Sequence, residues 1–122
     1  MLNYKKYAVL LAFLPVATLW GQVANAETLK TKNFNITITR NCPEGYVTCN
    51  DVTYYGKMQT RKSIRLNGRT IHATCADGVT PCRFLGYEFR NNKYLYRVTT
   101  DGTLQVYQGK KLILQEKGTL VS

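Results

Sequence analysis

The sequence has little of what most catalytic sites are built from. It contains one histidine, His72, and only two serines, Ser63 and Ser122. Nucleophilic catalysis needs a serine, threonine or cysteine beside a base, with a third group that orients the base. Ser63 and His72 are the one such pair the sequence suggests, and it has no third member. Nothing pairs the seven acidic residues as glycoside hydrolysis requires. We therefore expect a protein that is not an enzyme.

Only one long apolar run is present, and it lies at the amino terminus. Residues 8–20 are almost all apolar, follow a positively charged start and precede the tripeptide Ala24-Asn25-Ala26. This is the arrangement of a secretory signal peptide with an A-x-A cleavage site. A permanent membrane anchor is the alternative, but the run is shorter than the roughly 20 residues that span a bilayer. We expect residues 1–26 to be cleaved off after Ala26, leaving residues 27–122 soluble in the periplasm or secreted.

The mature chain is short and poor in acidic groups. A single domain of this size buries only about 60 to 65% of its unfolded surface and is marginal without cross-links. Once Lys5 and Lys6 are removed, fifteen Lys and Arg remain against seven Asp and Glu. In an exported protein this excess favours an anionic partner, such as a lipid headgroup, cell-wall polymer or acidic protein, over nucleic acid. The alternative is that the charge serves solubility alone.

All four cysteines fall into two loops of identical length. Cys42-Pro-Glu-Gly-Tyr-Val-Thr-Cys49 and Cys75-Ala-Asp-Gly-Val-Thr-Pro-Cys82 both read Cys-x-acid-Gly, three further residues, then Cys. Export favours disulfides, and the gaps do not match the short cysteine pairs of zinc sites. Three pairings are possible. We favour Cys42 with Cys49 and Cys75 with Cys82, because each bond closes across turn-forming residues. We expect no metal and no other cofactor.

The first half of the mature chain shows the alternation typical of β-strands. Residues 34–40 alternate apolar and polar side chains, which predicts a half-buried strand with Phe34, Ile36 and Ile38 inward. Residues 27–33 are polar and are predicted to be loose.

A second strand is predicted over residues 52–56. Its adjacent Tyr54 and Tyr55 must point to opposite faces of the sheet. The segment that follows, residues 56–62, is basic and has little apolar content. It is interpreted as a solvated connection, with a basic recognition loop as the alternative.

Residues 62–73 are predicted to form a hairpin. Asn67-Gly68 is a strong signal for a two-residue type I′ turn. Such a turn would place Ser63 opposite His72 and Arg65 on a polar, basic face. His72 would then be a solvated surface residue.

The last third of the chain predicts a four-stranded antiparallel meander. Turns are expected at Asn91-Asn92, Thr100-Asp101-Gly102 and Gln108-Gly109-Lys110, with Gly102 in the left-handed conformation. These turns place on one face Leu85, Tyr87, Phe89, Tyr94, Tyr96, Val98, Leu104, Val106, Leu112 and Leu114. The mature chain is therefore predicted to be an all-β, small antiparallel sandwich or barrel of about seven strands.

The outward face of this meander is one candidate binding surface. Leu95 is expected opposite Tyr107, and Arg97 opposite Gln105, so that an apolar and aromatic strip lies among basic residues. Tyr and Arg carry much of the binding energy at protein interfaces. The alternative is that a second sheet covers Leu95 and Ile113.

The loop Ala76–Pro81 is a second candidate, because it would present Asp77 and Thr80. An eight-residue disulfide ring contributes only about 2.5 kcal/mol through chain entropy. Fixing the shape of a projecting loop would lower the ordering cost of binding. The alternative is that both disulfide rings have only a structural role in the connections between strands. A third candidate, suited to an anionic polymer or lipid headgroup, consists of basic residues: Arg61, Lys62, Arg65, Arg69 and nearby lysines.

A cleaved leader, a basic β domain, two disulfides and no catalytic set together resemble small periplasmic inhibitor and immunity proteins. Examples are the lysozyme inhibitors of Gram-negative bacteria and the immunity proteins against cell-wall-degrading effectors of type VI secretion. The resemblance implies binding to, and inhibition of, a partner protein such as a lysozyme-like or other cell-wall-degrading enzyme. The Ser-Gly-rich loop of the membrane-bound lysozyme inhibitors has no counterpart here, so no inhibitory residue is carried over.

Two other functions are open at this point. A basic module that binds an anionic envelope polymer or lipid headgroup would differ from a protein inhibitor in its steep dependence on salt. An adhesin or envelope subunit should carry a donor strand or lipid anchor, and neither is visible in the sequence. Like charge opposes association, so an acidic partner would suit this basic chain better than a basic one.

Overall fold

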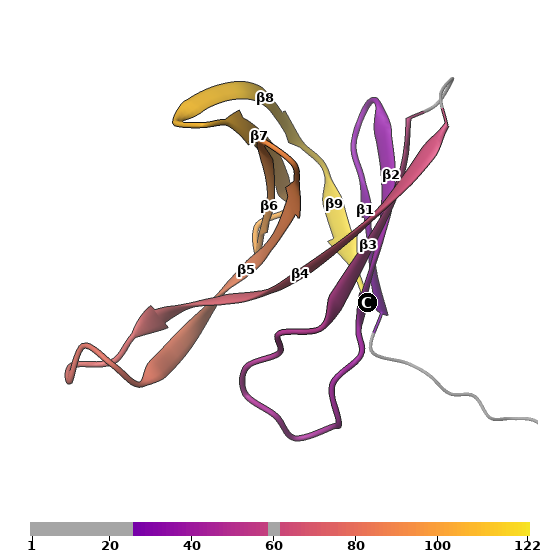
Figure 1. The fold of residues 1–122 in the computed structure, drawn as a ribbon. Coiled ribbons are helices and arrows are strands. Elements are labelled where there is room, and N and C mark those ends of the chain that lie inside the picture. Colours follow the sequence, from indigo (N-terminus) through magenta and orange to yellow (C-terminus); the bar gives the residue numbers. More distant parts are fainter. Residues whose placement is uncertain (1–25, 59–61) are drawn as a thin grey trace, which may run out of the picture.

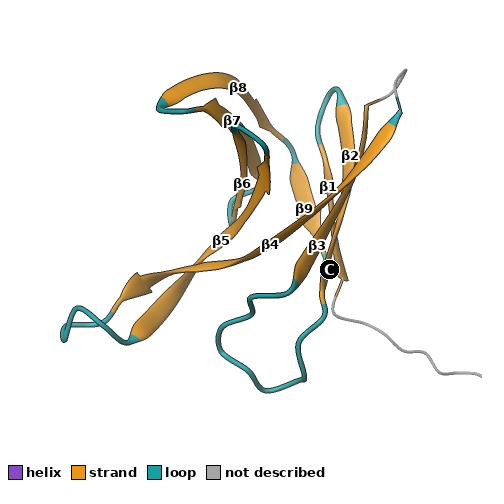
Figure 2. Ribbon diagram, in the orientation of Figure 1, coloured by secondary structure: helices purple, strands orange, loops and turns teal. Residues whose placement is uncertain are grey.

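A computed structural model describes residues 26–58 and 62–122. These residues form nine β-strands and no helix (Figures 1 and 2). The strands are β1 (Ala26–Lys30), β2 (Phe34–Arg40), β3 (Val52–Met58), β4 (Ser63–Thr74), β5 (Pro81–Asn91), β6 (Tyr94–Thr99), β7 (Thr103–Gln108), β8 (Lys111–Lys117) and β9 (Thr119–Val121). No helix in the described ranges could span a membrane. The expected leader, apart from Ala26, lies outside them, as does part of the basic segment 56–62.

The strands form a single antiparallel sheet that curls into a nearly closed barrel. Their hydrogen-bonded order is β8-β7-β6-β5-β4-β3-β2-β1-β9. The two edge strands, β8 and β9, are consecutive in the chain and are separated only by Gly118. Figure 1 shows β8 over the curved β5–β7 part and β9 continuing beside β1. The all-β prediction is confirmed as a barrel, with two more strands than the seven expected.

Gly118 joins the two parts of the sheet where the chain crosses between them. Its amide donates a hydrogen bond of 2.8 Å to the carbonyl oxygen of Gly102, in the β6–β7 turn. A Cβ at residue 118 would lie 1.9 Å from the carbonyl oxygen of Lys30, at the end of β1. Only glycine permits this backbone approach, so the closure of the barrel depends on a residue without a side chain.

β1 corrects the prediction that residues 27–33 are loose. It pairs with β2 on one side and with β9 on the other. Leu29 is fully buried at its centre. The strand has only one strongly apolar residue. One of the two strands that it pairs with, β9, lies at the distant carboxyl end of the chain. Local alternation is too weak to reveal a strand of this kind.

β4 corrects the predicted hairpin. Asn67 and Gly68 lie inside one twelve-residue strand, and neither has the positive φ that a type I′ turn requires. Gly68 pairs with Val52 of β3 and with Phe89 of β5. A Cβ there would lie 2.0 Å from the carbonyl oxygen of Glu88. The glycine allows a close approach of β5, and a dipeptide signal cannot distinguish that role from a turn.

The β6–β7 hairpin confirms the prediction made for it. Val98 faces Leu104 and Tyr96 faces Val106. Gly102 has a φ of 86°, the left-handed conformation expected for the turn. The β2 prediction also holds, because Ile36 and Ile38 are buried there.

The other two turns of the meander differ from the prediction. The β5–β6 turn lies one residue later, with Asn92 at a φ of 56°, so Phe89 faces Tyr96 rather than Tyr94. The register is shifted by two residues, and because an even shift keeps the alternation of faces, the same side chains point inward. In the β7–β8 hairpin the register shifts after Val106, and Leu112 faces Tyr107.

These irregularities change which side chains fill the interior. Leu85 and Leu112, both expected inside, are exposed, and Ile113, expected outside, is exposed as well but lines a pocket. Leu85 precedes Gly86, which has a φ of 138°, and β4 carries register shifts opposite this segment. Each bulge reverses the alternation beyond it. The buried apolar core consists of Leu29, Ile36, Ile38, Cys49, Val52, Tyr54, Leu66, Tyr87, Phe89, Val98, Leu104 and Val106.

Candidate binding surfaces

Both disulfides have the predicted local pairing. Cys42 is bonded to Cys49 and Cys75 to Cys82, with Cα atoms 5.8 Å and 5.2 Å apart. The first ring connects β2 to β3 and the second connects β4 to β5. Because these strands alternate in direction, both rings lie at the same end of the barrel wall, where both connections project (Figure 1).

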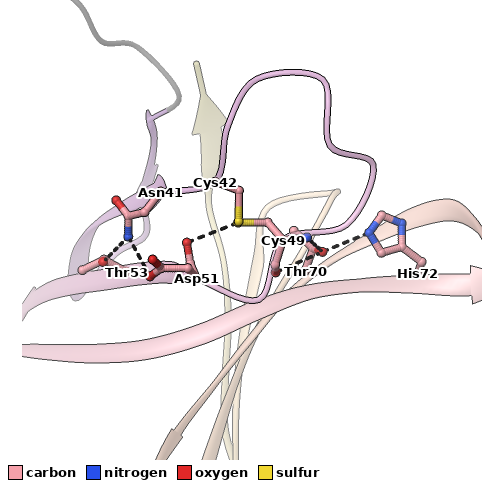
Figure 3. The surroundings of a disulfide bond; sticks show 7 residues. All are labelled: Asn41, Cys42, Cys49, Asp51, Thr53, Thr70 and His72. Atoms are coloured by element: carbon pink, nitrogen blue, oxygen red, sulfur yellow. Dashed lines mark hydrogen bonds between the residues drawn. A yellow bond between two sulfur atoms is a disulfide. The ribbon is translucent and has the colours of Figure 1, made fainter.

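The first loop is anchored to the barrel through Thr70 of β4. The amide of Cys49 donates to the Thr70 hydroxyl at 3.0 Å, and the amide of Thr70 donates to the Cys49 carbonyl at 2.8 Å (Figure 3). Both residues are buried. At the base of the loop, the Asn41 side chain donates to Asp51 at 3.2 Å and to Thr53 at 2.9 Å. The loop therefore begins and ends on fixed points.

His72 lies between the two disulfide rings. Its Nε2 is 3.0 Å from the Thr70 hydroxyl oxygen, and its Nδ1 is 3.3 Å from the carbonyl oxygen of Cys82. A carbonyl only accepts, so Nδ1 donates the hydrogen in its contact with Cys82. The ring also packs against Phe84, with centroids 5.6 Å apart. His72 thus connects the second ring to the residue that anchors the first.

The predicted proximity of Ser63 and His72 was wrong. Because β4 is continuous, the two residues lie towards opposite ends of a strand that spans Ser63–Thr74. The Ser63 hydroxyl oxygen instead accepts a hydrogen bond from the Tyr55 hydroxyl at 3.1 Å. His72 is a half-buried, hydrogen-bonded residue rather than a solvated one.

The second loop is held in shape by Asp77. Its Oδ1 accepts from the amides of Val79 and Thr80, each at 2.9 Å, and its Oδ2 accepts from the Thr80 hydroxyl. These hydrogen bonds, that from the Thr80 hydroxyl foremost, lower the pKa of Asp77 from 3.8 to about 2. The side chains of Asp77 and Thr80, expected to be presented to a partner, are exposed and also hydrogen-bond each other.

Each loop also presents an apolar side chain at its tip. Tyr46 in the first loop is 63% exposed, and Val79 in the second is 81% exposed. Both residues occupy the fourth position after the first cysteine of their ring. Val47, next to Tyr46, is also exposed. The matching position in the repeated Cys-x-acid-Gly pattern was the signal in the sequence that could have identified these residues.

The outward strip of the meander is assembled as expected on β5, β6 and β7. Leu95 faces Tyr107, and the guanidinium carbon of Arg97 lies 5.8 Å from the centre of the Tyr107 ring. The single sheet curls around its inner face, so no second sheet covers this strip in the described part of the chain. Exposed Leu112 extends the strip onto β8.

Acidic Glu88 lies among the predicted arginines. One carboxylate oxygen is 2.7 Å from Nη2 of Arg69 and the other is 3.5 Å from Nη2 of Arg97. Arg65 is separate from this group, and its guanidinium carbon lies 5.6 Å from the centre of the Tyr55 ring. Arg65 and Arg69 therefore contact different partners, and Arg61, the first of the predicted basic residues, lies outside the described residues.

No group of three His, Cys, Asp or Glu side chains in the described ranges could hold a metal ion. All four cysteines are oxidised. Comparisons with known protein families, curated proteins and solved structures gave no match. The surfaces themselves are thus the basis for inferring function.

Proposed function

We propose that the chain is an exported, non-enzymatic binding protein that inhibits or neutralises a partner protein, such as a cell-wall-degrading enzyme. The observation that carries this proposal is the pair of stapled loops at one end of the barrel, each with an exposed apolar side chain at the same position. Local disulfides of this kind fit an oxidising compartment outside the cytoplasm.

The shape of the loops supports binding more than stabilisation of the fold. Asp77 and the Thr70 anchor fix the loops before any partner arrives, so little conformational entropy remains to be lost on association. Tyr46 and Val79 then provide apolar area that water covers only in the free protein. Rigid aromatic and aliphatic anchors of this type carry much of the energy of protein interfaces.

The charges argue against an anionic polymer as the main partner. Arg69 and Arg97 share the carboxylate of Glu88, which lowers the net charge of the strip. Binding to a polymer gains its free energy from many unshared cations that displace counterions. The strip of Leu95, Arg97 and Tyr107 is better suited to a second protein contact.

The test is affinity capture followed by an activity assay. Oxidised residues 27–122 serve as bait in extracts of the periplasm and of neighbouring cells, and captured enzymes are assayed for cell-wall hydrolysis with and without the bait. We expect one captured protein, inhibited at a 1:1 ratio. Val79→Asp should weaken its binding by about tenfold or more, equivalent to about 1.4 kcal/mol.

Val121→Asp is the matched control, because Val121 is 57% exposed on β9 and outside the loops. It should leave capture and inhibition unchanged. Retention on anionic glycan or lipid alone, lost steeply as salt is raised, would instead show a polymer-binding module.

A further inference from the structure

A pocket of about 440 Å³ opens at the end of the barrel opposite the disulfide loops. It exists because β4 leaves β5 at Gly68. Residues 63–67 of β4 pair only with β3, and the pairing of β4 with β5 begins at Gly68. The two parts of the sheet separate beyond this point, and the interior becomes accessible between them.

At the loop end of the barrel, away from the pocket, aromatic and charged side chains pack against the core. There the guanidinium carbon of Arg40 lies 5.0 Å from the centre of the Phe84 ring and 5.7 Å from that of Tyr87. The Tyr87 hydroxyl donates to a Glu27 carboxylate oxygen at 2.6 Å. Burial, followed by this bond to Glu27, raises the pKa of Tyr87 to about 12.

The pocket wall is almost entirely apolar or aromatic. Buried Tyr54 and Val106 contribute to its lining, and the ring centres of Tyr54 and Tyr96 are 5.4 Å apart. Exposed Met58, Ile64 and Ile113 also line it. Its volume lies within the range of about 300–1,000 Å³ that is usual for small-molecule sites.

The charge around this opening is of one sign. Lys62 lines the pocket itself. Lys93 lies beside the lining residue Tyr94, with its Nζ 5.8 Å from the centre of that ring. The strand ends that form the opening, residues 56–58, 62–65, 90–95 and 107–114, contain no Asp or Glu.

Glu116, further along β8, is already engaged in hydrogen bonds and is not available to neutralise the lysines at the opening. Its carboxylate accepts hydrogen bonds from the Thr31 hydroxyl at 2.7 Å and from the Asn33 side chain at 2.6 Å. The opening is therefore complementary to an anion, whereas the wall behind it is complementary to hydrocarbon.

We propose that this pocket binds a single-chain amphiphile with an anionic head group, such as a fatty acid. The hydrocarbon chain occupies the space between Tyr54, Val106 and Ile113, and the head group pairs with Lys62. The site is at the other end of the barrel from the disulfide loops. If the pocket binds no amphiphile, the proposed inhibition by the loops is unaffected. If the loops bind no partner protein, the amphiphile site is unaffected.

Isothermal titration of residues 27–122 with dodecanoate, below the concentration at which it forms micelles, tests the proposal. We expect binding at a 1:1 ratio, and affinity for dodecyltrimethylammonium lower by about tenfold or more, because the cationic head meets Lys62. Lys62→Glu should reverse this order of preference.

Ile113→Asp and Leu112→Asp form a matched pair. The two residues are adjacent on β8 and similarly exposed, at 45% and 43%, but only Ile113 lines the pocket. Ile113→Asp should lower the affinity for dodecanoate by about tenfold or more, whereas Leu112→Asp should leave it within about twofold. Circular dichroism of both variants confirms that they are folded.

Four results would overturn the proposal: no binding of dodecanoate by the folded protein, equal affinity for the cationic amphiphile, equal loss in both aspartate variants, or binding only to anionic phosphatidylglycerol vesicles. The last result would assign the basic opening to a membrane surface rather than to a bound monomer.

Discussion

Thr70 is the residue through which the first disulfide loop is attached to the barrel. Its hydroxyl accepts from the Cys49 amide and lies 3.0 Å from Nε2 of His72. Valine has nearly the same shape but offers no hydrogen bond. Replacing Thr70 would therefore leave a buried amide without its partner.

We expect Thr70→Val to lower the free energy of unfolding by about 1–3 kcal/mol, the cost of an unsatisfied buried polar group. Urea denaturation of the oxidised mature protein measures this change. Thr37→Val, on a half-exposed position of β2, is the control and should change the stability by less than about 0.5 kcal/mol. Equal effects of the two substitutions would contradict the anchoring role.

Asp77 makes the second loop sensitive to acid only at very low pH. Its pKa in the folded protein, about 2, is below the ordinary 3.8. A lowered pKa means that the ionised form stabilises the loop, fully above about pH 4 and progressively less as the pH falls through 2.

The amide resonances of Val79 and Thr80 should therefore titrate with a midpoint near pH 2 in an NMR experiment, because Asp77 accepts from both amides. Asp77→Asn should remove this titration. A midpoint near 3.8 would show that the carboxylate is free in solution.

At the scale of elements, the two disulfide rings differ in burial but not in length. Each closes a separation of seven residues, so chain entropy contributes the same amount, about 2.5 kcal/mol, to both. Cys49 lies in the core and Cys42 packs against it, whereas Cys82 is exposed.

Replacing Cys42 and Cys49 by alanine should therefore destabilise the protein more than replacing Cys75 and Cys82, by about 1 kcal/mol or more from lost packing. Urea denaturation of the two double variants compares them directly. Equal losses of stability in the two double variants would show that burial of the first ring adds nothing to its effect.

β4 also yields a prediction at this scale. In a strand, Asn67→Val should be tolerated or slightly stabilising, because β-branched residues suit extended backbone. At the first central position of a type I′ turn, the same substitution would require a positive φ and would be strongly destabilising. Thermal denaturation of this variant distinguishes a continuous β4 from a hairpin.

The elements that the sequence predicts well are those with strong local signals. Alternation identified β2, and Gly102 identified the register of β6 with β7. The pairing of β1 with β9 and the close approach of β5 at Gly68 depend on strands outside the local sequence, whereas the register shift between β7 and β8 is an irregularity within one hairpin. The candidate strip was predicted because its residues pair across β6 and β7, whose register was correct. The exposed loop residues Tyr46 and Val79 were not predicted, because the expectation rested on their polar neighbours.

At the scale of the whole molecule, the barrel separates two surfaces. One end carries both rigid loops, linked at their bases by Thr70 and His72. The other end carries the apolar pocket with its basic opening. The backbone contacts of Gly118 hold the two parts of the sheet together.

The most direct test of the central claim, that the loop tips contact a partner protein, is site-specific photo-crosslinking. A benzophenone amino acid is placed at position 46, 79 or 121 of the oxidised mature protein, which is then irradiated in the extracts used for capture. We expect positions 46 and 79 to label the same protein and position 121 to label none. Equal labelling from position 121, or no protein labelled from either loop, would contradict the claim.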